Sequence, residues 1–552
     1  MIKNIFYLLL STLCISKVYS ECWSESLGYN CCSIGTQPVF SDYEGVWGME
    51  DDQWCGIIIS PSIDDNCSNY NCCTNSSTNV SFIENENYLG VESGSWCKIN
   101  FPNNNDDLDG CWSLKYGYGC CSIDNEEVLY NDDDGFWGVE NNQWCGITNY
   151  KSTVDVSKLP SFPKNILDPE TYNDPAKDCN ITDSITGESF KQYAPFRVGV
   201  GINGYSRTTS GILSKKMDDI VLYQFNSITL TNVMKPQYLL DQGASKKNIL
   251  KGLEEPGINF DSVIDALEFC KKNNLKMRGH TLVWHTQTPL WFFKEKFNEN
   301  NNYVSKEVME IRMESYIRQV LQFVQYYYPD VVDVWDVVNE AVEIEEGKYD
   351  KTSTWKTRTM CNNDPNPWYD TMGQDYVATA FRIARKYAAP GVKLIYNDYN
   401  TFMSAKTNAI YNLLEILKGE DLIDGIGLQS YLSPTWPSRN DYSNAIKKFA
   451  KLNLEIQITE LTISVNTGLT DEEIYEQQAE QYKVVFDIYL KLYHSGINIG
   501  SVTVFGLQDG FRFYDSDSTK TRLWDHDLIK KKAYYSILEV FQSYYEQYNN
   551  NE

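Results

Sequence analysis

The stretch VDVWDVVNEAVE, residues 332–343, decides the fold of the larger part of this chain. It begins as a run of β-branched and apolar residues, which is typical of a buried parallel strand, and continues into the polar pair Asn339–Glu340. In a barrel of parallel strands the catalytic groups lie at the C-terminal ends of the strands, on a rigid backbone. Glu340 is therefore the first candidate for chemistry, although a lone Asn-Glu pair after a strand can also be a helix cap or a surface feature.

A second stretch repeats the pattern. LEIQITELTI, residues 454–463, is another β-branched run that carries a carboxylate, Glu460. The 120 residues (460 − 340) between the two glutamates correspond to three βα units of about 40 residues each. This spacing predicts that Glu340 and Glu460 lie on strands four and seven of one barrel, facing each other across its mouth.

Short apolar runs alternate with amphipathic stretches from Arg197 onward, in the rhythm of βα units. The expected strands are FRVGVG, NSITL, LKMRGH, VVDVWDVVN, VKLIYN, GIGLQSY, LEIQITE and SVTVFG. Eight such runs predict an α/β fold, a (β/α)8 TIM barrel, over residues 176–548. One expected helix spans 260–274, and Cys270 on it reads as a core thiol.

The length and charge of the chain restrict its class. A length of 552 residues implies more than one domain. Residues 1–20 have an early lysine, an apolar core and small residues before Glu21, so they predict a cleaved signal peptide and a secreted, extracellular protein. No later run approaches 18 apolar residues, and no membrane segment is expected. The net charge of −27 argues against nucleic acid and anionic membranes as partners, because both require clustered Lys and Arg.

Most of the 16 cysteines fall before residue 150, in three groups of four. The groups are Cys22, Cys31, Cys32 and Cys55; Cys67, Cys72, Cys73 and Cys97; and Cys111, Cys120, Cys121 and Cys145. A secreted chain is oxidised and the spacing lacks a CxxC pair, which favours disulfides over zinc. A bond within an adjacent Cys-Cys pair is strained, so each member is expected to reach a different distant cysteine.

The outer two cysteine groups belong to internal repeats. ECWSESLGYNCC (21–32) matches GCWSLKYGYGCC (110–121), and DYEGVWGMEDDQWCGI (42–57) matches DDDGFWGVENNQWCGI (132–147). We expect three small disulfide-stapled β modules, at 21–60, 67–100 and 111–148, followed by a linker over 149–175. Their shared aromatic and acidic residues form either a binding face or the module core. These residues are Tyr29, Asp42 and Trp47 in the first repeat and Tyr118, Asp132 and Trp137 in the third.

The repeats resemble the dockerin modules of anaerobic gut fungi, which are related to family-10 cellulose-binding modules. The resemblance implies that they attach the chain to the scaffold protein of a multi-enzyme cellulolytic complex, a cellulosome, and that the shared Tyr, Asp and Trp residues carry the docking. The middle repeat departs, with Glu84 and Leu89 in place of Asp and Trp and glycosylation sequons at Asn66, Asn75 and Asn79. We therefore expect the outer repeats to bind one partner and the middle repeat to bind it poorly.

Two carboxylates at the mouth of a barrel suit the hydrolysis of a glycosidic bond, which requires one protonated and one ionised carboxyl group. Other strand ends carry side chains that hydrogen-bond hydroxyl groups or stack on sugars, although a lone His280 is more often structural. These candidates are Asn232, Lys235, His280, Trp284, Gln287, Asn339, Asn397, Asn400, Gln429 and Tyr431. HExxH, P-loop, GxSxG and GxGxxG motifs are absent, so neither a metal nor an organic cofactor is expected.

The motifs NSITLTNVMK, RGHTLVWH, WDVVNEAV, YNDYN, GIGLQS, ITEL and KKAYYSIL resemble those of family-10 glycoside hydrolases, the endo-1,4-β-xylanases. The resemblance covers about 176–548. It implies a retaining, double-displacement hydrolysis of xylan or a related β-1,4-linked polysaccharide, with Glu340 as acid/base and Glu460 as nucleophile. It also implies that Asn339 reaches the sugar 2-hydroxyl and that Asn232, Lys235, His280, Trp284 and Gln429 line the glycone side.

The sequence departs from that family at four positions. Thr231 stands where the family has Glu, and Phe505 where it has Trp. Tyr431 and Thr462 stand where the family has a His and an Asp that orient the nucleophile. Their joint replacement indicates a compensated change. A tyrosine hydroxyl can still donate to Glu460, but a neutral donor stabilises a carboxylate less than a charged imidazole does. Two alternatives follow: a glycosidase of altered β-glycan specificity, or a carbohydrate-binding barrel with weakened catalysis.

Overall fold

The computed structural model divides into two compact units, residues 1–149 and 150–552. In the second unit it describes 154, 156–163, 176, 178–202, 215–344, 355–361, 364–465, 468–510 and 520–549. In the first unit it describes short strands and single residues between 30 and 147. The expected signal peptide (1–20), Tyr29, Asp42 and the sequons at Asn66, Asn75 and Asn79 lie outside the described residues.

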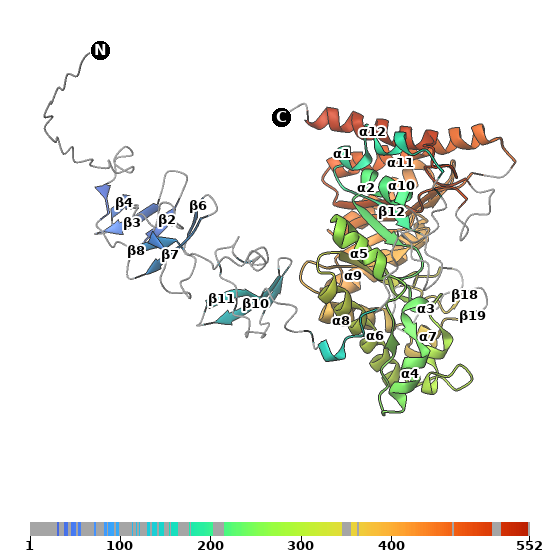
Figure 1. The fold of residues 1–552 in the computed structure, drawn as a ribbon, viewed down its shortest axis with the longest axis horizontal. Helices are drawn as coiled ribbons and strands as arrows, with labels where there is room; N and C mark the ends of the chain where they lie inside the picture. The colour runs from blue at the N-terminus through green and yellow to red at the C-terminus, as the bar shows by residue number, and fades with distance from the viewer. Residues whose placement is uncertain are drawn as a thin grey trace, which may run out of the picture. The chain divides into compact units, whose positions relative to one another are not determined.

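Each repeat of the first unit forms its own small sheet (Figure 1). The first contains β1 (Asn30–Cys31), β2 (Pro38–Ser41), β3 (Val46–Glu50) and β4 (Gln53–Gly56) in the order β1-β4-β3-β2. The middle repeat has β5 (Asn71–Cys72), β6 (Phe82–Glu84), β7 (Asn87–Glu92) and β8 (Ser95–Lys98) in the equivalent order β5-β8-β7-β6. The third contains β9 (Tyr130–Asp132), β10 (Gly135–Glu140) and β11 (Gln143–Ile147). The middle repeat thus keeps the topology of the first although it has lost the Trp.

Disulfides join distant parts of the two outer repeats. Cys32 bonds to Cys55, and Cys121 bonds to Cys145. Each bond takes one member of a Cys-Cys pair to the cysteine near the end of its repeat, as expected. By the loop-entropy estimate, closing a loop of this length stabilises a module by about 3 kcal/mol. The bonds of the other cysteines in the three groups lie outside what the structure describes.

The second unit is a barrel of eight parallel strands, which confirms the predicted TIM barrel. In barrel order the strands are β12 (Arg197–Ile202), β13 (Ser227–Leu230), β16 (Lys276–Trp284), β17 (Val332–Asn339), β20 (Lys393–Asp398), β21 (Gly425–Leu428), β23 (Glu455–Ile463) and β24 (Ile499–Val504). Pairing of β24 with β12 and of β21 with β23 closes the barrel. Each of the eight expected runs contributes one strand, with Glu340 directly after the fourth and Glu460 on the seventh.

Helices follow each barrel strand and cover the sheet (Figure 1). The helices of the second unit are α1 (Phe190–Tyr193), α2 (Lys215–Gln224), α3 (Pro236–Leu239), α4 (Gln242–Ile249), α5 (Ile264–Asn273), α6 (Lys306–Tyr327), α7 (Pro367–Met372), α8 (Tyr376–Tyr387), α9 (Ser404–Gly419), α10 (Arg439–Ala450), α11 (Asp471–His494) and α12 (Lys532–Asn549). A capping box starts α11, because Thr470 and Glu473 exchange side-chain and backbone hydrogen bonds. Cys270 on α5 is a free, fully buried thiol. None of the helices described is both long and apolar enough to cross a membrane.

Part of the segment expected to be a linker packs on the barrel. The ring centroid of Phe162 lies 4.9 Å from that of Tyr327 and 6.1 Å from that of Phe323, both on α6, and Val154 is buried. Val154 and Phe162 therefore differ from residues of a free linker, because both side chains are covered. The linker was expected because the segment contains Ser, Pro and Asp and shows no periodicity. Residues 164–175 lie outside the described part of the chain.

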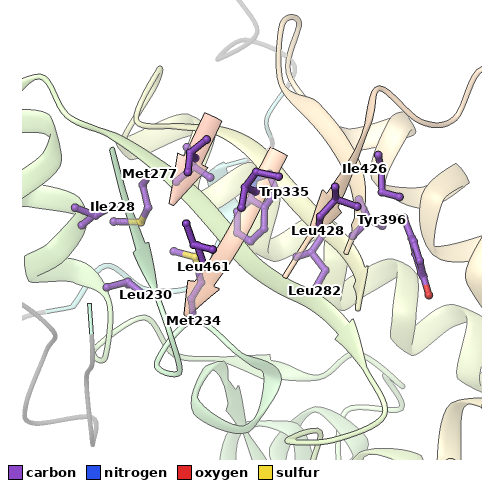
Figure 2. Packing of buried hydrophobic residues seen from close by; sticks show 14 of the residues in the cluster. Ile228, Leu230, Met234, Met277, Leu282, Trp335, Tyr396, Ile426, Leu428 and Leu461 are labelled. Atoms are coloured by element: carbon purple, nitrogen blue, oxygen red, sulfur yellow. The ribbon is translucent and has the colours of Figure 1, made fainter. Parts of the chain in front are cut away.

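Close packing between β16 and β17 depends on a glycine. Gly279 is paired with Trp335 across the two strands, and a Cβ atom on Gly279 would lie 2.2 Å from the Trp335 ring. Figure 2 shows Trp335 among apolar side chains that include Leu282, Leu428 and Leu461. Trp335 is fully buried, so its ring has little space into which it can move.

Gly279→Ala is expected to destabilise the barrel by about 3 kcal/mol, because overpacking displaces the indole of Trp335. Calorimetric thermal unfolding should show a fall of several degrees in the Tm of the barrel. The matched control is Gly419→Ala at the end of α9, where an added Cβ would meet nothing within 4 Å. Equal Tm values for the two variants would contradict the packing argument.

Candidate active site

Glu340 lies directly after β17, and hydrogen bonds fix both its backbone and its carboxyl group. Its φ of 57° is rare for a residue other than glycine. Its N–H donates to the Asn397 carbonyl (2.9 Å), and its own carbonyl accepts from Arg358 Nε (2.9 Å). On the side chain, Oε2 accepts from Trp284 Nε1 (3.0 Å) and Oε1 accepts from Gln429 Nε2 (2.9 Å). The carboxyl group therefore has one defined orientation.

The surroundings of Glu340 favour its protonated form. Burial raises the pKa of this carboxyl group, and the negative charges of Asp398 and Glu460 raise it further. The hydrogen bond from Gln429 and the positive charge of Arg358 act in the opposite direction, and the net shift is upward. A raised pKa keeps a proton on the group closer to neutral pH, which is the property that a general acid requires.

Glu460 lies within β23 and is 5% exposed. Its Oε1 accepts from Asn397 Nδ2 (3.0 Å), and its Oε2 accepts from the Tyr431 hydroxyl (2.5 Å). Each carboxyl oxygen therefore has one donor, which fixes the plane of the group. Tyr431, on the short strand β22 (Tyr431–Leu432), is 39% exposed, so this side of the carboxylate lies near the surface.

A continuous chain of amide side chains connects the two carboxyl groups. Asn339 Oδ1 accepts from Gln429 Nε2 (3.2 Å) and from Asn397 Nδ2 (3.0 Å). These same donors reach Glu340 and Glu460, respectively. Four consecutive strands, β17, β20, β21 and β23, thus bring their C-terminal ends together around the two glutamates. This is the convergence that the positions of the two glutamates predicted.

A second group of predicted residues gathers around Lys235, which follows β13. Its Nζ donates to Gln287 Oε1 (2.9 Å) and to Asn232 Oδ1 (3.3 Å) and lies 4.6 Å from the centroid of the Trp284 ring. Lys235 is only 3% exposed. Burial lowers its pKa to about 8, although the negative charges of Glu460 and Glu340 raise it. Trp284 connects this group to Glu340.

His280 occupies a separate position in the barrel. Its Nδ1 lies 2.7 Å from Asp336 Oδ2, and Asp336 Oδ1 accepts from Arg278 (2.5 Å). All three side chains are almost completely buried. Within the described residues no hydrogen bond or ion pair joins His280 to either glutamate, so its role rests on the resemblance alone.

Three of the four departures from the family pattern, Tyr431, Thr462 and Phe505, gather beside Glu460. Tyr431 is paired with Thr462 across β22 and β23, and Thr462 Oγ1 donates to the Glu460 carbonyl (3.2 Å). Phe505 meets the Tyr431 ring edge to face at 6.2 Å. The fully buried Thr231 donates to the Ile202 carbonyl. The neutral hydroxyl of Tyr431 therefore donates to Glu460 at the position where the resemblance places a histidine in the family.

The third repeat buries Trp137 and exposes Trp144. Trp137 is 7% exposed, and the Tyr118 ring packs edge to face on it at 5.1 Å. Trp137 therefore belongs to the module core, which is one of the two alternatives that the sequence left open for it. Tyr118 and Trp144 are 43% and 45% exposed. Of the other expected docking residues, Trp47 and Asp132 are described only as backbone positions on β3 and β9.

Trp144 is a residue that the sequence reasoning overlooked, and a signal for it was present. A Trp precedes the last cysteine in all three repeats, as Trp54, Trp96 and Trp144. Trp144 lies opposite Val139, in the register that places Trp54 opposite Met49 and Trp96 opposite Val91. In the barrel, the exposed Trp436 was overlooked as well. It follows β22 and packs edge to face on Phe402.

Comparison with known families matches both units. The model of glycosyl hydrolase family 10 matches residues 188–540, and the model described as a cellulose or protein binding domain matches 21–57 and 110–147. These last two stretches are the outer repeats; the middle repeat lies outside them.

Individual relatives align with the barrel. A putative endo-1,4-β-xylanase of Caldicellulosiruptor saccharolyticus is 42% identical over 318 residues, which is 56% of this chain and 96% of the relative. Endo-1,4-β-xylanase B of Butyrivibrio fibrisolvens is 38% identical over 63% of this chain, although the match spans only 52% of that protein.

Solved structures show the same fold. The CBM22-1–GH10 modules of a Clostridium thermocellum endo-1,4-β-D-xylanase, complexed with xylohexaose, align with a TM-score of 0.57 at 31% identity, covering 64% of this chain and 67% of that one. An endo-1,4-β-xylanase from Caldicellulosiruptor owensensis aligns with a TM-score of 0.51 at 35% identity, covering 63% and 97%. The family-10 model matches residues 188–540, more than half of the chain, on a barrel that brings two glutamates together at strands four and seven. The chain therefore belongs to glycosyl hydrolase family 10.

Proposed function

We propose that this chain is a retaining endo-1,4-β-xylanase that cleaves xylan by double displacement. Glu340 protonates the departing glycosidic oxygen while a Glu460 oxygen attacks the anomeric carbon to form a glycosyl ester. Glu340, now ionised, then removes a proton from the water that cleaves this ester. The observation that carries the assignment is the convergence of two carboxyl groups, each held by donors on both oxygens, at the mouth of the barrel. Of the two, Glu340 has the raised pKa that a general acid requires.

Product stereochemistry tests this proposal. Proton NMR during the first turnovers of xylohexaose should show the β-anomer of the new reducing end before mutarotation. Reducing-sugar release should be much faster from xylan than from cellulose or mixed-linkage glucan. Initial formation of the α-anomer would contradict retention.

A second candidate is a glycosidase that acts on a different β-linked glycan. Thr231 and Phe505 favour it, because they replace larger or charged family residues beside the candidate site. Faster release from mixed-linkage glucan than from xylan would establish this alternative. If none of the three polymers released sugar, the chain would be a carbohydrate-binding barrel with weakened catalysis.

We further propose that protonated Lys235 binds the glycone hydroxyl groups with Asn232 and Gln287. Because burial lowers the pKa of Lys235 to about 8, the ammonium group is present below that pH and is lost above it. Calorimetric affinity for xylobiose should therefore fall as the pH rises through about 8. Lys235→Met should bind more weakly and without this pH dependence. Equal wild-type affinity at pH 6.5 and pH 9.5 would refute the assignment.

The N-terminal repeats are proposed to dock the enzyme into a cellulosome. Tyr118 and Trp144 expose aromatic surface on the third repeat, and the family model that matches both outer repeats is described as binding cellulose or protein. Two weak modules on one chain can raise avidity by factors of about a hundred if the partner offers two sites within reach.

Capture of the full chain by a gut-fungal cellulosome fraction, compared with capture on microcrystalline cellulose, tests the docking role. We expect Trp144→Ala to reduce capture by the protein fraction about tenfold through the loss of avidity. Leu89→Ala in the middle repeat is the control and should do little. If the wild type binds cellulose and ignores the protein fraction, the repeats are cellulose-binding modules instead.

Secretion is proposed from residues 1–20. N-terminal sequencing of the protein recovered from culture medium should begin at Glu21. Retention of Met1 in the extracellular protein would contradict cleavage.

A further inference from the structure

Side chains on the two faces of strand β20 hold the two glutamates by hydrogen bonds, Glu460 directly and Glu340 through its backbone. Asn397 donates to Glu460, as described above. Its neighbours Tyr396 and Asp398 point to the other face and are both fully buried. The Tyr396 hydroxyl accepts hydrogen bonds from the backbone N–H groups of Ala341 and Val342, each at 3.0 Å. These are the two residues that follow Glu340, so Tyr396 holds the backbone on which the carboxyl group is carried.

Asp398 sets the direction of the Tyr396 hydroxyl. The hydroxyl donates its only proton to Asp398 Oδ2 (2.5 Å), which leaves its lone pairs for the two N–H groups. Asp398 Oδ1 in turn accepts from Lys406 Nζ on α9 (2.7 Å), and Lys406 is also buried. The charge of Asp398 is thus paired, and every member of this buried group has a defined donor or acceptor role.

Arg358 holds the same backbone from the other side. Its Nε donates to the Glu340 carbonyl (2.9 Å), and its backbone N–H donates to the Ala341 carbonyl (2.7 Å). Its Nη1 lies 2.9 Å from Glu343, and its Nη2 donates to the Tyr399 hydroxyl. With the bond from the Glu340 N–H to Asn397, five consecutive polar backbone atoms of residues 340–342 have partners outside the segment.

We propose that Tyr396 and Asp398 are positioning residues for the candidate acid/base Glu340, acting through the backbone of Ala341 and Val342. The φ of 57° at Glu340 is a strained conformation that surrounding contacts must maintain. Without the hydroxyl of Tyr396, two buried N–H groups lose their acceptor and the backbone relaxes. The carboxyl group then moves away from Trp284 and Gln429. This inference rests on the proposed role of Glu340 as proton donor.

The roles of the two positioning residues can be separated experimentally. Tyr396 holds the backbone by neutral hydrogen bonds, whereas Asp398 also places a negative charge near Glu340. Asp398, Glu460, Arg358 and Lys235 interact electrostatically with Glu340. Behind them, Lys406 pairs with Asp398, Glu343 pairs with Arg358, and His285 is influenced by Arg358 and Lys406. Asp398 and Glu460 raise the pKa of Glu340, whereas Arg358 lowers it. Removing the negative charge of Asp398 should therefore lower that pKa.

The first test compares leaving groups in Tyr396→Phe. A carboxyl group displaced by about 1 Å is expected to lose up to about a hundredfold in rate, and only where proton transfer is needed. We therefore expect kcat/KM for xylohexaose to fall about 10- to 100-fold, and kcat/KM for 2,4-dinitrophenyl β-xylobioside to change by less than about threefold. The dinitrophenolate leaves without a proton, so it does not depend on the position of Glu340.

Tyr534→Phe is the matched control. Tyr534, on α12, is also fully buried, and its hydroxyl proton is shared between the Glu188 carbonyl and Gln224 Oε1, each at 3.1 Å. This variant should lower Tm while leaving the ratio of the two kcat/KM values unchanged. An equal loss on both substrates in Tyr396→Phe would show a merely structural role and would overturn the inference.

The second test is Asp398→Asn, which keeps an acceptor for the Tyr396 hydroxyl and removes the charge. The basic limb of the kcat/KM profile for xylohexaose should move to lower pH, because Glu340 then loses its proton earlier. An unmoved basic limb would overturn the role of Asp398. Glu340→Ala tests separately whether Glu340 is the proton donor. If kcat/KM falls equally for xylohexaose and for the dinitrophenyl substrate in this variant, Glu340 is not the acid. If Glu340→Ala loses more on xylohexaose and Tyr396→Phe does not, only this inference fails.

Discussion

Glu460→Ala is expected to lower kcat on xylan by about four to six orders of magnitude. Removing this carboxylate removes the atom proposed to attack the anomeric carbon, and the donors on Asn397 and Tyr431 then face an empty space. Binding should survive, because the group around Lys235 is untouched. Initial rates of reducing-sugar release from xylan, at substrate concentrations well above KM, provide the measurement.

Glu455→Ala on the same strand is the matched control for Glu460→Ala. Glu455 is also buried, at 7% exposed, but it lies at the opposite end of β23 and pairs with Lys393. It should lower stability and change kcat by less than about tenfold. Azide should restore bond cleavage in Glu460→Ala with an activated substrate, because it fits the vacated space and attacks the same face. The product should be the α-glycosyl azide. Full activity of Glu460→Ala on xylan would remove Glu460 from the mechanism.

The barrel could be predicted from sequence because its signal is local and repeated. Each strand is a short β-branched run, and a carboxylate at the end of such a run must lie at the mouth of the barrel, whatever the loops do. The spacing between Glu340 and Glu460 then places them on strands four and seven. The same reasoning placed Asn339 and Gln429 near both glutamates, where the structure shows them in hydrogen bonds.

The positioning contacts could not be predicted because they depend on which face of a strand a residue occupies. Tyr396, Asn397 and Asp398 are adjacent in sequence, yet Asn397 reaches Glu460 while its neighbours hold the backbone behind Glu340. The left-handed backbone at Glu340 also left no trace in the sequence, since glutamate is not a residue that favours it.

Burial in the small modules was equally hard to predict. Trp137 and Trp144 are both near the last cysteine of the third repeat, and nothing in their neighbours shows which ring becomes core. The distinction arises from Tyr118, a residue far back in the repeat, whose ring covers Trp137. Similarly, Phe162 looked like part of a linker because its partners, Phe323 and Tyr327, lie about 160 residues further along the chain.

Glu340→Ala is expected to divide substrates according to their leaving groups. For xylohexaose, whose leaving group is a sugar hydroxyl, kcat/KM should fall by about two to four orders of magnitude, because the departing oxygen is no longer protonated. For 2,4-dinitrophenyl β-xylobioside, kcat/KM should remain near the wild-type value, because that leaving group needs no proton. Azide should raise kcat on this substrate and give the β-glycosyl azide, since Glu460 still forms the intermediate.

The pH profile provides an independent reading of the same variant. In the wild type, kcat/KM for xylohexaose falls as the pH rises through the raised pKa of Glu340, because the protonated form is the active one. In Glu340→Ala this fall of kcat/KM at high pH should be absent. The pH dependence of xylobiose binding, which arises from Lys235, should remain. It should move to lower pH, because the negative charge of Glu340 no longer raises the pKa of Lys235. Equal losses of kcat/KM on both substrates, with an unchanged basic limb, would mean that another group donates the proton.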